Sequence, residues 1–342
     1  MIQPLRAALV GCGGISRAWL SAIAGMPDLA LVGLVDLNAA LAEQRAQEYG
    51  LSAALTGDDL ESILTRTEAD LVFNCTVPAA HREVTLTALR SGCHVLGEKP
   101  LAETLDQARE MIAAAEAADK LFAVIQNRRY DAQIRRVQTL LRSGALGRLT
   151  TINSDFYIGA HFGGFRDQMA HVLLLDMAIH TFDAARMLAQ ADPVAVYCHE
   201  WNPSGSWYAR DASAVAIFEF AGGLIYTYRG SWCAEGLPTS WESDWRIIGE
   251  RGSVRWDGGA QLQAQVVEPT PGRFSLPTRE LEPPPLDREY LGGHAGQIHE
   301  FVACVRSGRQ PETIAADNIK SLAMTLAAIE SAERGQRVAV AW

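Results

Sequence analysis

The sequence predicts two domains of different class: an α/β domain with a parallel sheet, then an α+β domain with a large, mostly antiparallel open sheet. Three observations predict this division. The first third alternates apolar strand patterns with helical patterns, which is typical of successive βαβ units. From Pro193 onward strand patterns follow one another directly, with glycine turns between them. The length of 342 residues is also typical of about two domains.

Composition narrows the range of partners. The chain is 48% hydrophobic and 20% charged, as in ordinary globular proteins. Its net charge of -10, with no run of Lys or Arg, disfavours nucleic acid or an anionic membrane and favours a small-molecule ligand. The six cysteines include no C-x-x-C pair, which is typical of free thiols in a reducing compartment. The apolar run before Gly11 is too short for a signal peptide or a membrane span, so we expect a cytoplasmic protein.

A glycine-rich turn joins the first expected strand to the first helix. The strand covers Leu5–Val10, the turn is Gly11-Cys12-Gly13-Gly14-Ile15-Ser16, and an apolar-periodic stretch runs from Ala18 to Ala24. Gly11 permits a tight turn, Gly13 lets the backbone approach a pyrophosphate, and the helix N-terminus favours an anion. Ser16 stands where the dinucleotide-binding fingerprint usually has a third Gly or Ala. The candidate phosphate-binding residues are Gly11, Gly13, Gly14 and Ile15.

An acidic residue follows the second expected strand. Ala30–Val35 ends in Asp36, twenty residues beyond Ser16. A carboxylate at this distance can accept hydrogen bonds from the adenosine ribose and repels a 2'-phosphate. A glycine turn alone is often only a turn. Because the acid and the continuing strand-helix alternation support it here, we expect a Rossmann domain that binds NAD in preference to NADP.

Two later strand ends in the first third carry polar candidates. The strand Asp70–Asn74 runs into Thr76 and Pro78, and His81 opens the next helix. These three residues could line the nicotinamide side of the cofactor site. In the alternative reading, Pro78 merely ends the strand and His81 lies near the helix start.

The segment Glu98-Lys99-Pro100 comes shortly after the expected strand Cys93–Leu96, at the second of these strand ends. Pro100 disfavours a helical backbone at Lys99, which places an extended Lys99 where open parallel sheets bind ligands. Strand alternation points Glu98 away from Lys99, which suits a structural or cofactor-side role.

The remaining elements of the first domain complete the alternation. They are the helices Asp58–Leu64, Arg82–Arg90 and Leu105–Ala118 and a last strand, Leu121–Gln126. We place the first domain at residues 1–126 and the second at 127–342, whose last helix and strand could pack back toward the first.

The second domain contains an apolar helix with an acid-histidine pair. A strand at Leu149–Ile158 and a polar, aromatic loop precede a helix expected over Met169–Leu188. Asp176 and His180 are four positions apart and share one face. A buried Asp and His must be hydrogen-bonded or ligated. By themselves they fit a self-satisfied structural pair, a proton-transfer pair or, with Asp183, a metal site. His171 lies off that face and fits a satisfied core or rim position.

Strand patterns dominate the rest of the chain. We expect strands at Val194–Glu200, Ser213–Phe220, Leu224–Trp232, Trp245–Gly249, Ser253–Trp256 and Gln261–Val267, a proline-rich surface loop at 268–287, helices at Ala295–Arg306 and Asn318–Arg334, and a closing strand at Arg337–Ala341. A large open sheet needs its second face covered. We therefore expect a homodimer or homotetramer formed through this sheet.

Motifs in this order give a family resemblance. The Gly11-Cys12-Gly13-Gly14-Ile15 turn with Asp36, the Glu98-Lys99-Pro100 segment and the helix Asp176-Met177-Ala178-Ile179-His180 resemble the glucose-fructose oxidoreductase, inositol dehydrogenase and MocA (Gfo/Idh/MocA) family over essentially the whole chain. Asn127-Arg128-Arg129-Tyr130-Asp131 looks like that family's junction into its second domain. The chain departs from the pattern at Val172-Leu173-Leu174-Leu175, where family members often have consecutive glycines.

The resemblance implies an NAD-dependent oxidoreductase that acts on a secondary hydroxyl of a sugar, inositol or polyol. We expect no metal, because Asp183 is one turn beyond His180 and nothing supplies a clear third ligand. The resemblance also implies His180 as general base, Lys99 as the cation that stabilises the substrate oxygen, and Asp176 as orienter of both. The two base roles could be exchanged. Substrate-contact candidates are Tyr157, His161 and Arg166. Two alternatives stay open: a closed-cycle enzyme with tightly held NAD(P), either a transhydrogenase or a redox-assisted hydrolase, and a non-catalytic NAD-sensing protein.

Overall fold

The computed structural model describes residues 3–268 and 274–342 and divides into two compact units. The first unit contains the chain up to Tyr130 together with Leu291–Leu322, and the second contains Asp131–Tyr290 and Ala323–Trp342. The expected boundary after residue 126 therefore differs from the units at two places. Residues 127–130 and 291–322 lie in the first unit, because helix α9 (Gly293–Ser307) packs Ile298 and Phe301 into the core of the first sheet.

The first unit is built on a six-stranded sheet of order β3-β2-β1-β4-β5-β6, in which every neighbouring pair is parallel. This confirms the expected Rossmann-type sheet. The strands are β1 (Leu5–Val10), β2 (Leu29–Val35), β3 (Leu55–Gly57), β4 (Leu71–Asn74), β5 (His94–Gly97) and β6 (Phe122–Val124). The helices are α1 (Ser16–Ile23), α2 (Ala39–Glu48), α3 (Leu60–Thr67), α4 (Pro78–Arg90), α5 (Leu105–Ala117), the short 3₁₀ helix η1 (Asn127–Tyr130) and α9.

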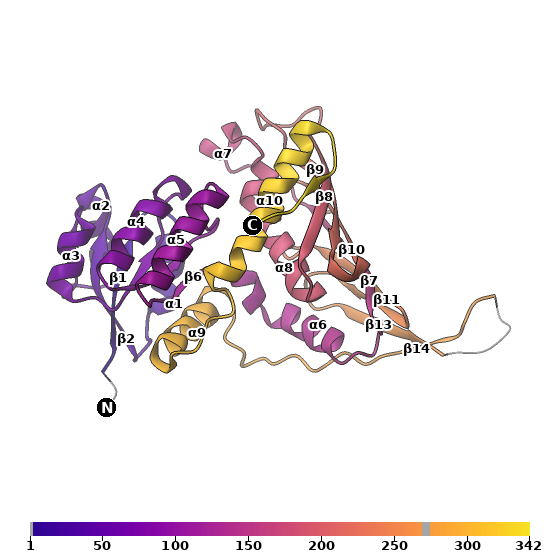
Figure 1. The fold of residues 1–342 in the computed structure, drawn as a ribbon, viewed down its shortest axis with the longest axis horizontal. Coiled ribbons are helices and arrows are strands. Elements are labelled where there is room, and N and C mark those ends of the chain that lie inside the picture. Colours follow the sequence, from indigo (N-terminus) through magenta and orange to yellow (C-terminus); the bar gives the residue numbers. More distant parts are fainter. Residues whose placement is uncertain (1–2, 269–273) are drawn as a thin grey trace. The chain divides into compact units, whose positions relative to one another are not determined.

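Helices cover the first sheet because its strands are apolar on both faces. Leu9 and Phe73 share a core with Trp19 of α1, Ala42 of α2 and Phe301 of α9. Alternate strand residues such as Ala8 are also fully buried. Helices α3, α4 and α5 stand side by side along the sheet (Figure 1). Because all strands run in one direction, the segments that follow β1, β2, β4 and β5 meet at the same edge.

The second unit is built on a nine-stranded sheet of order β14-β13-β12-β11-β7-β10-β9-β8-β15. Its neighbouring pairs are antiparallel, except that β7 and β10 pair in parallel. The fold class expected for this part is confirmed. The strands are β7 (Leu149–Tyr157), β8 (Pro193–Trp201), β9 (Ser213–Phe220), β10 (Ile225–Ser231), β11 (Asp244–Gly249), β12 (Gly252–Trp256), β13 (Leu262–Val267), β14 (Thr278–Glu280) and β15 (Val338–Ala339), with the short helix η3 (Ala221–Gly223) before β10.

Besides η3, the helical segments that accompany this sheet are α6 (Ala132–Arg142), α7 (Phe165–Gln168), the π-helix η2 (Leu173–Ala178), α8 (Ile179–Ala189) and α10 (Ala315–Arg334), which begins in the first unit. The single helix expected from Met169 is wrong in its first turn. Met169 has an extended backbone and His171 has a φ of 51°, so helical structure begins only after His171. The sequence pattern missed this because the next four residues, Val172 to Leu175, are all apolar.

The two faces of the second sheet differ. Phe182 of α8 lies edge-on to Phe218 and Tyr228, with ring centroids 4.8 and 5.2 Å apart, so this face holds an aromatic core. Tyr226 is fully buried whereas Ile225 is 36% exposed, as the expected alternation requires. On the outer face Tyr197 and Ile217 are 45% and 42% exposed and are register partners.

The proline-rich stretch 268–287 contains one strand that the sequence analysis did not predict. Thr278–Glu280 pairs with β13 as the edge strand β14, directly after Pro277. Proline is tolerated beside an edge strand because the outer side needs no ladder hydrogen bonds. Pro269 and Pro271 of the expected loop lie outside the described residues.

Across the part of the chain that the structure describes, each helix is too short or too polar to span a bilayer.

Candidate active site

The turn between β1 and α1 is built so that only glycine fits at its first position. Gly11 has a φ of 91°, and a Cβ there would lie 2.7 Å from the Cys75 carbonyl carbon and 2.8 Å from the Thr76 nitrogen. At Gly13 and Gly14 a Cβ would meet no atom within 4 Å. Gly11 thus closes the turn against the segment after β4, while Gly13 and Gly14 have no protein atom packed against the position of a Cβ. Ile15, which follows, is 42% exposed.

Asp36 fixes this turn from the end of β2. Its Oδ2 accepts from the Cys12 amide at 2.8 Å and its Oδ1 accepts from the Asn38 amide at 2.9 Å. Each carboxylate oxygen can accept a further bond, so the ribose hydroxyls of a dinucleotide are compatible with this arrangement. The buried Arg45 of α2 donates to the Cys12 carbonyl at 3.0 Å and pairs with Glu48. The turn is therefore held at both the amide and the carbonyl group of Cys12.

The segment after β4 is organised by Asn74. The Asn74 Oδ1 accepts from the Thr76 hydroxyl at 2.6 Å and from the Thr76 amide at 3.2 Å. Pro78 is the first residue of α4, where the missing amide hydrogen of proline is harmless. The hydroxyl of Thr76 is thus directed by Asn74, and Pro78 begins α4 rather than merely ending the strand before it.

His81 connects two of these loops. Its side chain is buried, with Nδ1 2.8 Å from the Pro100 carbonyl and Nε2 3.0 Å from the Thr76 carbonyl. Burial lowers the pKa of His81, although the two carbonyls oppose that shift. Both ring nitrogens face backbone carbonyls, so His81 ties the segment after β4 to the segment after β5.

Glu98 is a buried anchor beside Lys99. Its Oε1 accepts from Trp19 Nε1 at 2.7 Å and lies 3.7 Å from His294 Nε2, while its Oε2 accepts from the Lys99 amide at 3.2 Å. Burial by itself would raise the pKa of Glu98, but His294, Trp19 and the charge of Lys99 outweigh it, so the pKa is lowered. The expected structural role of Glu98 agrees with these contacts. Lys99 is half-buried and precedes a cis peptide bond to Pro100.

In the second unit, Asp176 and His180 lie where a π-helix passes into an α-helix. Asp176 belongs to η2 and His180 to the first turn of α8. π-helical turns are rare in proteins, and those that occur are frequently found at functional sites. Arg166 donates to Asp176 from Nε to Oδ2 at 2.8 Å and from Nη2 to Oδ1 at 3.3 Å. The Asp176 carboxylate is therefore held by a residue that the sequence analysis assigned to substrate.

Two aromatic rings lie against the guanidinium of Arg166. Its guanidinium carbon lies 5.0 Å from the centre of the Phe162 ring and 4.8 Å from that of Phe165. These cation-π contacts and the bidentate ion pair with Asp176 together fix the plane of the guanidinium. The loop at 159–168 thus reaches the helix that carries Asp176.

The other two substrate candidates lie at the edge of the same loop. His161 Nε2 is 2.7 Å from Glu235 Oε1, and its ring stacks on Trp207 at 3.7 Å. Both partners of the pair are more than 60% exposed. Tyr157 ends β7, and burial, followed by the charge of Asp155, raises the pKa of its hydroxyl. His161 therefore presents a solvent-facing stacked ring.

Several supporting residues escaped the sequence analysis: Trp19, Arg45, Asn74 and His294. Only Asn74 gave a local signal, as the polar last residue of an otherwise apolar strand. The other three act through contacts with residues distant in sequence, which no spacing rule reveals.

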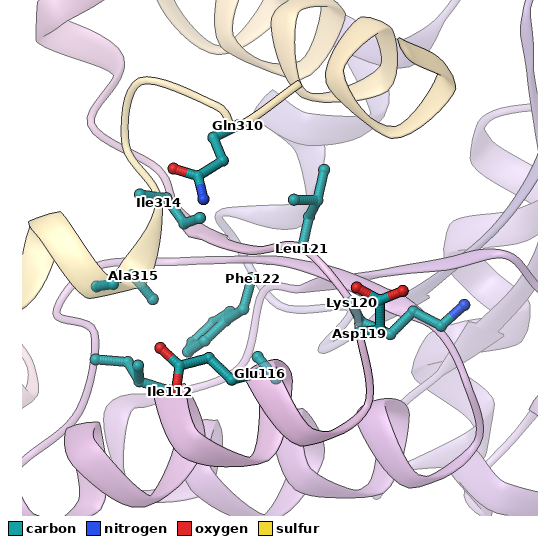
Figure 2. Close-up of a pocket in the computed structure, with 11 residues that line it drawn as sticks. Ile112, Glu116, Asp119, Lys120, Leu121, Phe122, Gln310, Ile314 and Ala315 are labelled. Atoms are coloured by element: carbon teal, nitrogen blue, oxygen red, sulfur yellow. The ribbon is translucent and has the colours of Figure 1, made fainter. Parts of the chain in front are cut away.

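A pocket of about 350 Å³ lies elsewhere in the first unit. Figure 2 shows Phe122 on its floor, with Glu116 on one side and Gln310 and Ile314 on the other. Its lining includes none of the candidate site residues. Among the described residues, no three His, Cys, Asp or Glu side chains gather as a metal ion would require.

The glycine turn, the acid after β2 and the parallel sheet define the first unit as a dinucleotide-binding domain. Two family models match the chain. The oxidoreductase family with an NAD-binding Rossmann fold matches residues 5–126, and the Gfo/Idh/MocA C-terminal domain matches residues 134–255. The protein belongs to the Gfo/Idh/MocA family of NAD-binding oxidoreductases.

Curated relatives and solved structures agree with this assignment. The chain is 32% identical over 245 residues to D-glucoside 3-dehydrogenase of Escherichia coli, which covers 65% of this chain and 69% of that protein. It is 26% identical over 334 residues to 1,5-anhydro-D-fructose reductase of Ensifer adhaerens, covering 96% of each. An oxidoreductase from Agrobacterium radiobacter, solved with NAD+, L-tartaric acid and magnesium, has the same fold, with a TM-score of 0.85, 21% identity and 99% coverage of both chains.

Proposed function

We propose that this NAD-dependent oxidoreductase oxidises a secondary hydroxyl of a sugar, inositol or polyol, or reduces the corresponding ketone. The observation that carries the proposal is the ion pair that fixes Asp176 four residues before His180, on a chain whose relatives are named for a D-glucoside and for 1,5-anhydro-D-fructose. A carboxylate held in one orientation can in turn orient an imidazole for proton transfer.

The residues of the first unit would hold the cofactor. Gly13 and Gly14 leave open space for the pyrophosphate, Gly11 keeps the turn closed, and Asp36 accepts from the adenosine ribose. The negative charge of Asp36 disfavours a 2'-phosphate, which supports NAD over NADP. When bound, NAD supplies the acceptor for the hydride.

Proton handling falls to three side chains in this proposal. His180 removes the hydroxyl proton, Lys99 donates a hydrogen bond to the developing alkoxide, and Asp176 orients the imidazole. Lys99 and His180 could exchange the first two roles. Arg166 keeps the Asp176 carboxylate in place, because the guanidinium donates to both of its oxygens. His161 and Tyr157 are the remaining candidates for substrate contact.

A second copy of the chain would cover the outer face of the second sheet. Five large apolar residues on β8, β9 and β10 are each at least 36% exposed there: Val194, Tyr197, Trp201, Ile217 and Ile225. Association through such a patch removes apolar surface from water and yields a homodimer, or a homotetramer if a second surface is used. All six cysteines are free, which supports a cytoplasmic location.

The deciding experiment is a spectrophotometric screen of NAD and NADP reduction against aldoses, glycosides, inositols and polyols. We expect net NADH with at least one of them, and loss of turnover in Lys99→Ala and in His180→Ala while NADH binding persists. Product without net NADH would support the closed-cycle alternative. NADH binding with no turnover of any compound would support the sensor.

A further inference from the structure

His171 occupies an unusual backbone position directly before the helical segment that carries Asp176 and His180. Its φ of 51° lies in the left-handed region, which residues other than glycine adopt rarely. The His171 carbonyl accepts from the Leu175 amide at 2.9 Å, so this residue makes the first backbone bond of the segment. A histidine in such a conformation persists only where its surroundings hold it.

Contacts of the His171 side chain with two glutamates hold the residue in this conformation. Its Nδ1 lies 2.6 Å from Glu200 Oε2 on β8, and its Nε2 lies 3.5 Å from Glu333 Oε1 on α10. The Glu200 side chain is 3% exposed and that of Glu333 is 62% exposed. Carboxylates only accept when ionised, so an imidazole flanked by two of them is best satisfied with a proton on both nitrogens.

The electrostatic surroundings agree with that geometry. The hydrogen bond that His171 donates to Glu200 raises the pKa of His171, and the charges of Glu200, Glu333 and Asp211 reinforce the rise against the opposing effect of burial. Burial raises the pKa of Glu200, and the nearby His171 opposes that rise. The raised pKa of His171 therefore favours the imidazolium form beside Glu200.

We propose that His171 is a positioning residue, whose imidazolium, held between Glu200 and Glu333, fixes the start of the segment that presents Asp176 and His180. This inference rests on the proposed function for its catalytic consequence. The π-helix begins two residues later, at Leu173, so the direction of its first turn is set by the peptide of His171. Releasing the imidazole frees that turn and misplaces the carboxylate and the imidazole that follow.

Two substitutions of His171 separate the effect of its backbone conformation from the effect of its side chain. His171→Gly accepts the left-handed backbone without strain but removes the imidazole. His171→Asn also tolerates this backbone and keeps a hydrogen-bond donor for Glu200, but it cannot carry a charge. His299→Asn, on α9 in the other unit, is the matched control.

The first measurement is hydrogen exchange of peptides covering 172–189, corrected for intrinsic rates, in the intact protein. In the unsubstituted protein we expect protection at about pH 6 that declines by about pH 9, as the imidazolium loses its proton. His171→Gly should be unprotected at both values, and His171→Asn should show intermediate protection that no longer depends on pH. Equal protection of the unsubstituted protein at both values overturns the inference.

The second measurement is steady-state kinetics with a substrate found in the screen. We expect His171→Gly to lower kcat about 10-fold or more with little change in KM, and His171→Asn to restore part of kcat. An unchanged kcat in His171→Gly overturns the inference. Should no compound be turned over while the exchange pattern follows the expectation, the proposed function fails and the anchoring role of His171 stands.

Discussion

Arg166 donates hydrogen bonds to both carboxylate oxygens of Asp176, from Nε to Oδ2 at 2.8 Å and from Nη2 to Oδ1 at 3.3 Å. The Asp176 side chain is only 15% exposed, and the Phe162 and Phe165 rings lie against the guanidinium. An ionised carboxylate that is mostly removed from water depends on such a partner. The orientation of Asp176 is therefore set by a residue of the short helix α7, ten positions earlier in the chain.

Replacing Arg166 tests this dependence. Arg166→Ala should lower kcat by about 10-fold or more, because Asp176 loses its charge partner and with it a fixed orientation. Arg166→Lys should recover only part of the loss, since an ammonium cannot donate in the same two-pronged geometry. Steady-state kinetics with a matched control, Arg82→Ala, measure the effect. Arg82 forms a comparable pair with Glu110 on the surface of the first unit, and its removal should leave kcat unchanged.

The glycine turn gives a prediction that separates folding from binding. Gly11→Ala should destabilise the protein by about 2 kcal/mol or more, because the new methyl group would overlap the Cys75 carbonyl and φ would be strained. Gly13→Ala should leave the melting temperature unchanged, since its Cβ meets no protein atom, but should weaken NADH binding by about 10-fold or more through contact with the pyrophosphate. Thermal unfolding and fluorescence titration with NADH check both effects. Equal NADH affinity in Gly13→Ala and the unsubstituted protein would contradict the assigned phosphate position.

His81 should make stability depend on pH. Its pKa is lowered in the folded state, so the unfolded chain takes up the proton first. The contribution of the neutral ring is complete above the unfolded pKa of about 6.5 and is lost as pH falls below that value toward the lowered folded pKa. Denaturant unfolding between about pH 5 and pH 7.5 should therefore show stability rising with pH, by at most about 1.4 kcal/mol per pH unit for this one group.

The same series on His81→Gln should show a shallower rise, because glutamine does not titrate. His299→Gln should reproduce the profile of the unsubstituted protein. Identical slopes in the unsubstituted protein and His81→Gln would assign the pH dependence to other groups.

The outer face of the second sheet should be the oligomer contact. Ile217→Lys places a charge at the centre of the exposed apolar patch, opposite Tyr197 in the strand register. Burying that charge without a partner is unfavourable, so sedimentation velocity should show a shift toward monomer. Gln44→Lys, which adds the same charge at an exposed position of α2, should leave the sedimentation coefficient unchanged. Monomeric unsubstituted protein would refute this interface.

Local sequence patterns predicted much of the architecture because they depend only on neighbouring residues. A glycine turn between a strand and a helix, an acid at the end of the next strand and alternation in Leu224–Arg229 are each read within a short window. The same windows failed at Met169–His171, where a helix was expected but the backbone is not yet helical. They also omitted β3 and β14, each three residues long and formed by pairing with a neighbouring strand.

The sequence by itself determined the class of protein: a Rossmann domain with an NAD-type fingerprint, a lysine at the end of β5, and an acid-histidine pair on one helical segment. Only the tertiary structure decided which distant side chains contact the residues of these segments. Trp19 reaches Glu98 across 79 positions, and His171 reaches Glu200 across 29. A helical or strand period fixes the faces of one element, but the pairing of faces between distant elements is set by how their side chains pack together.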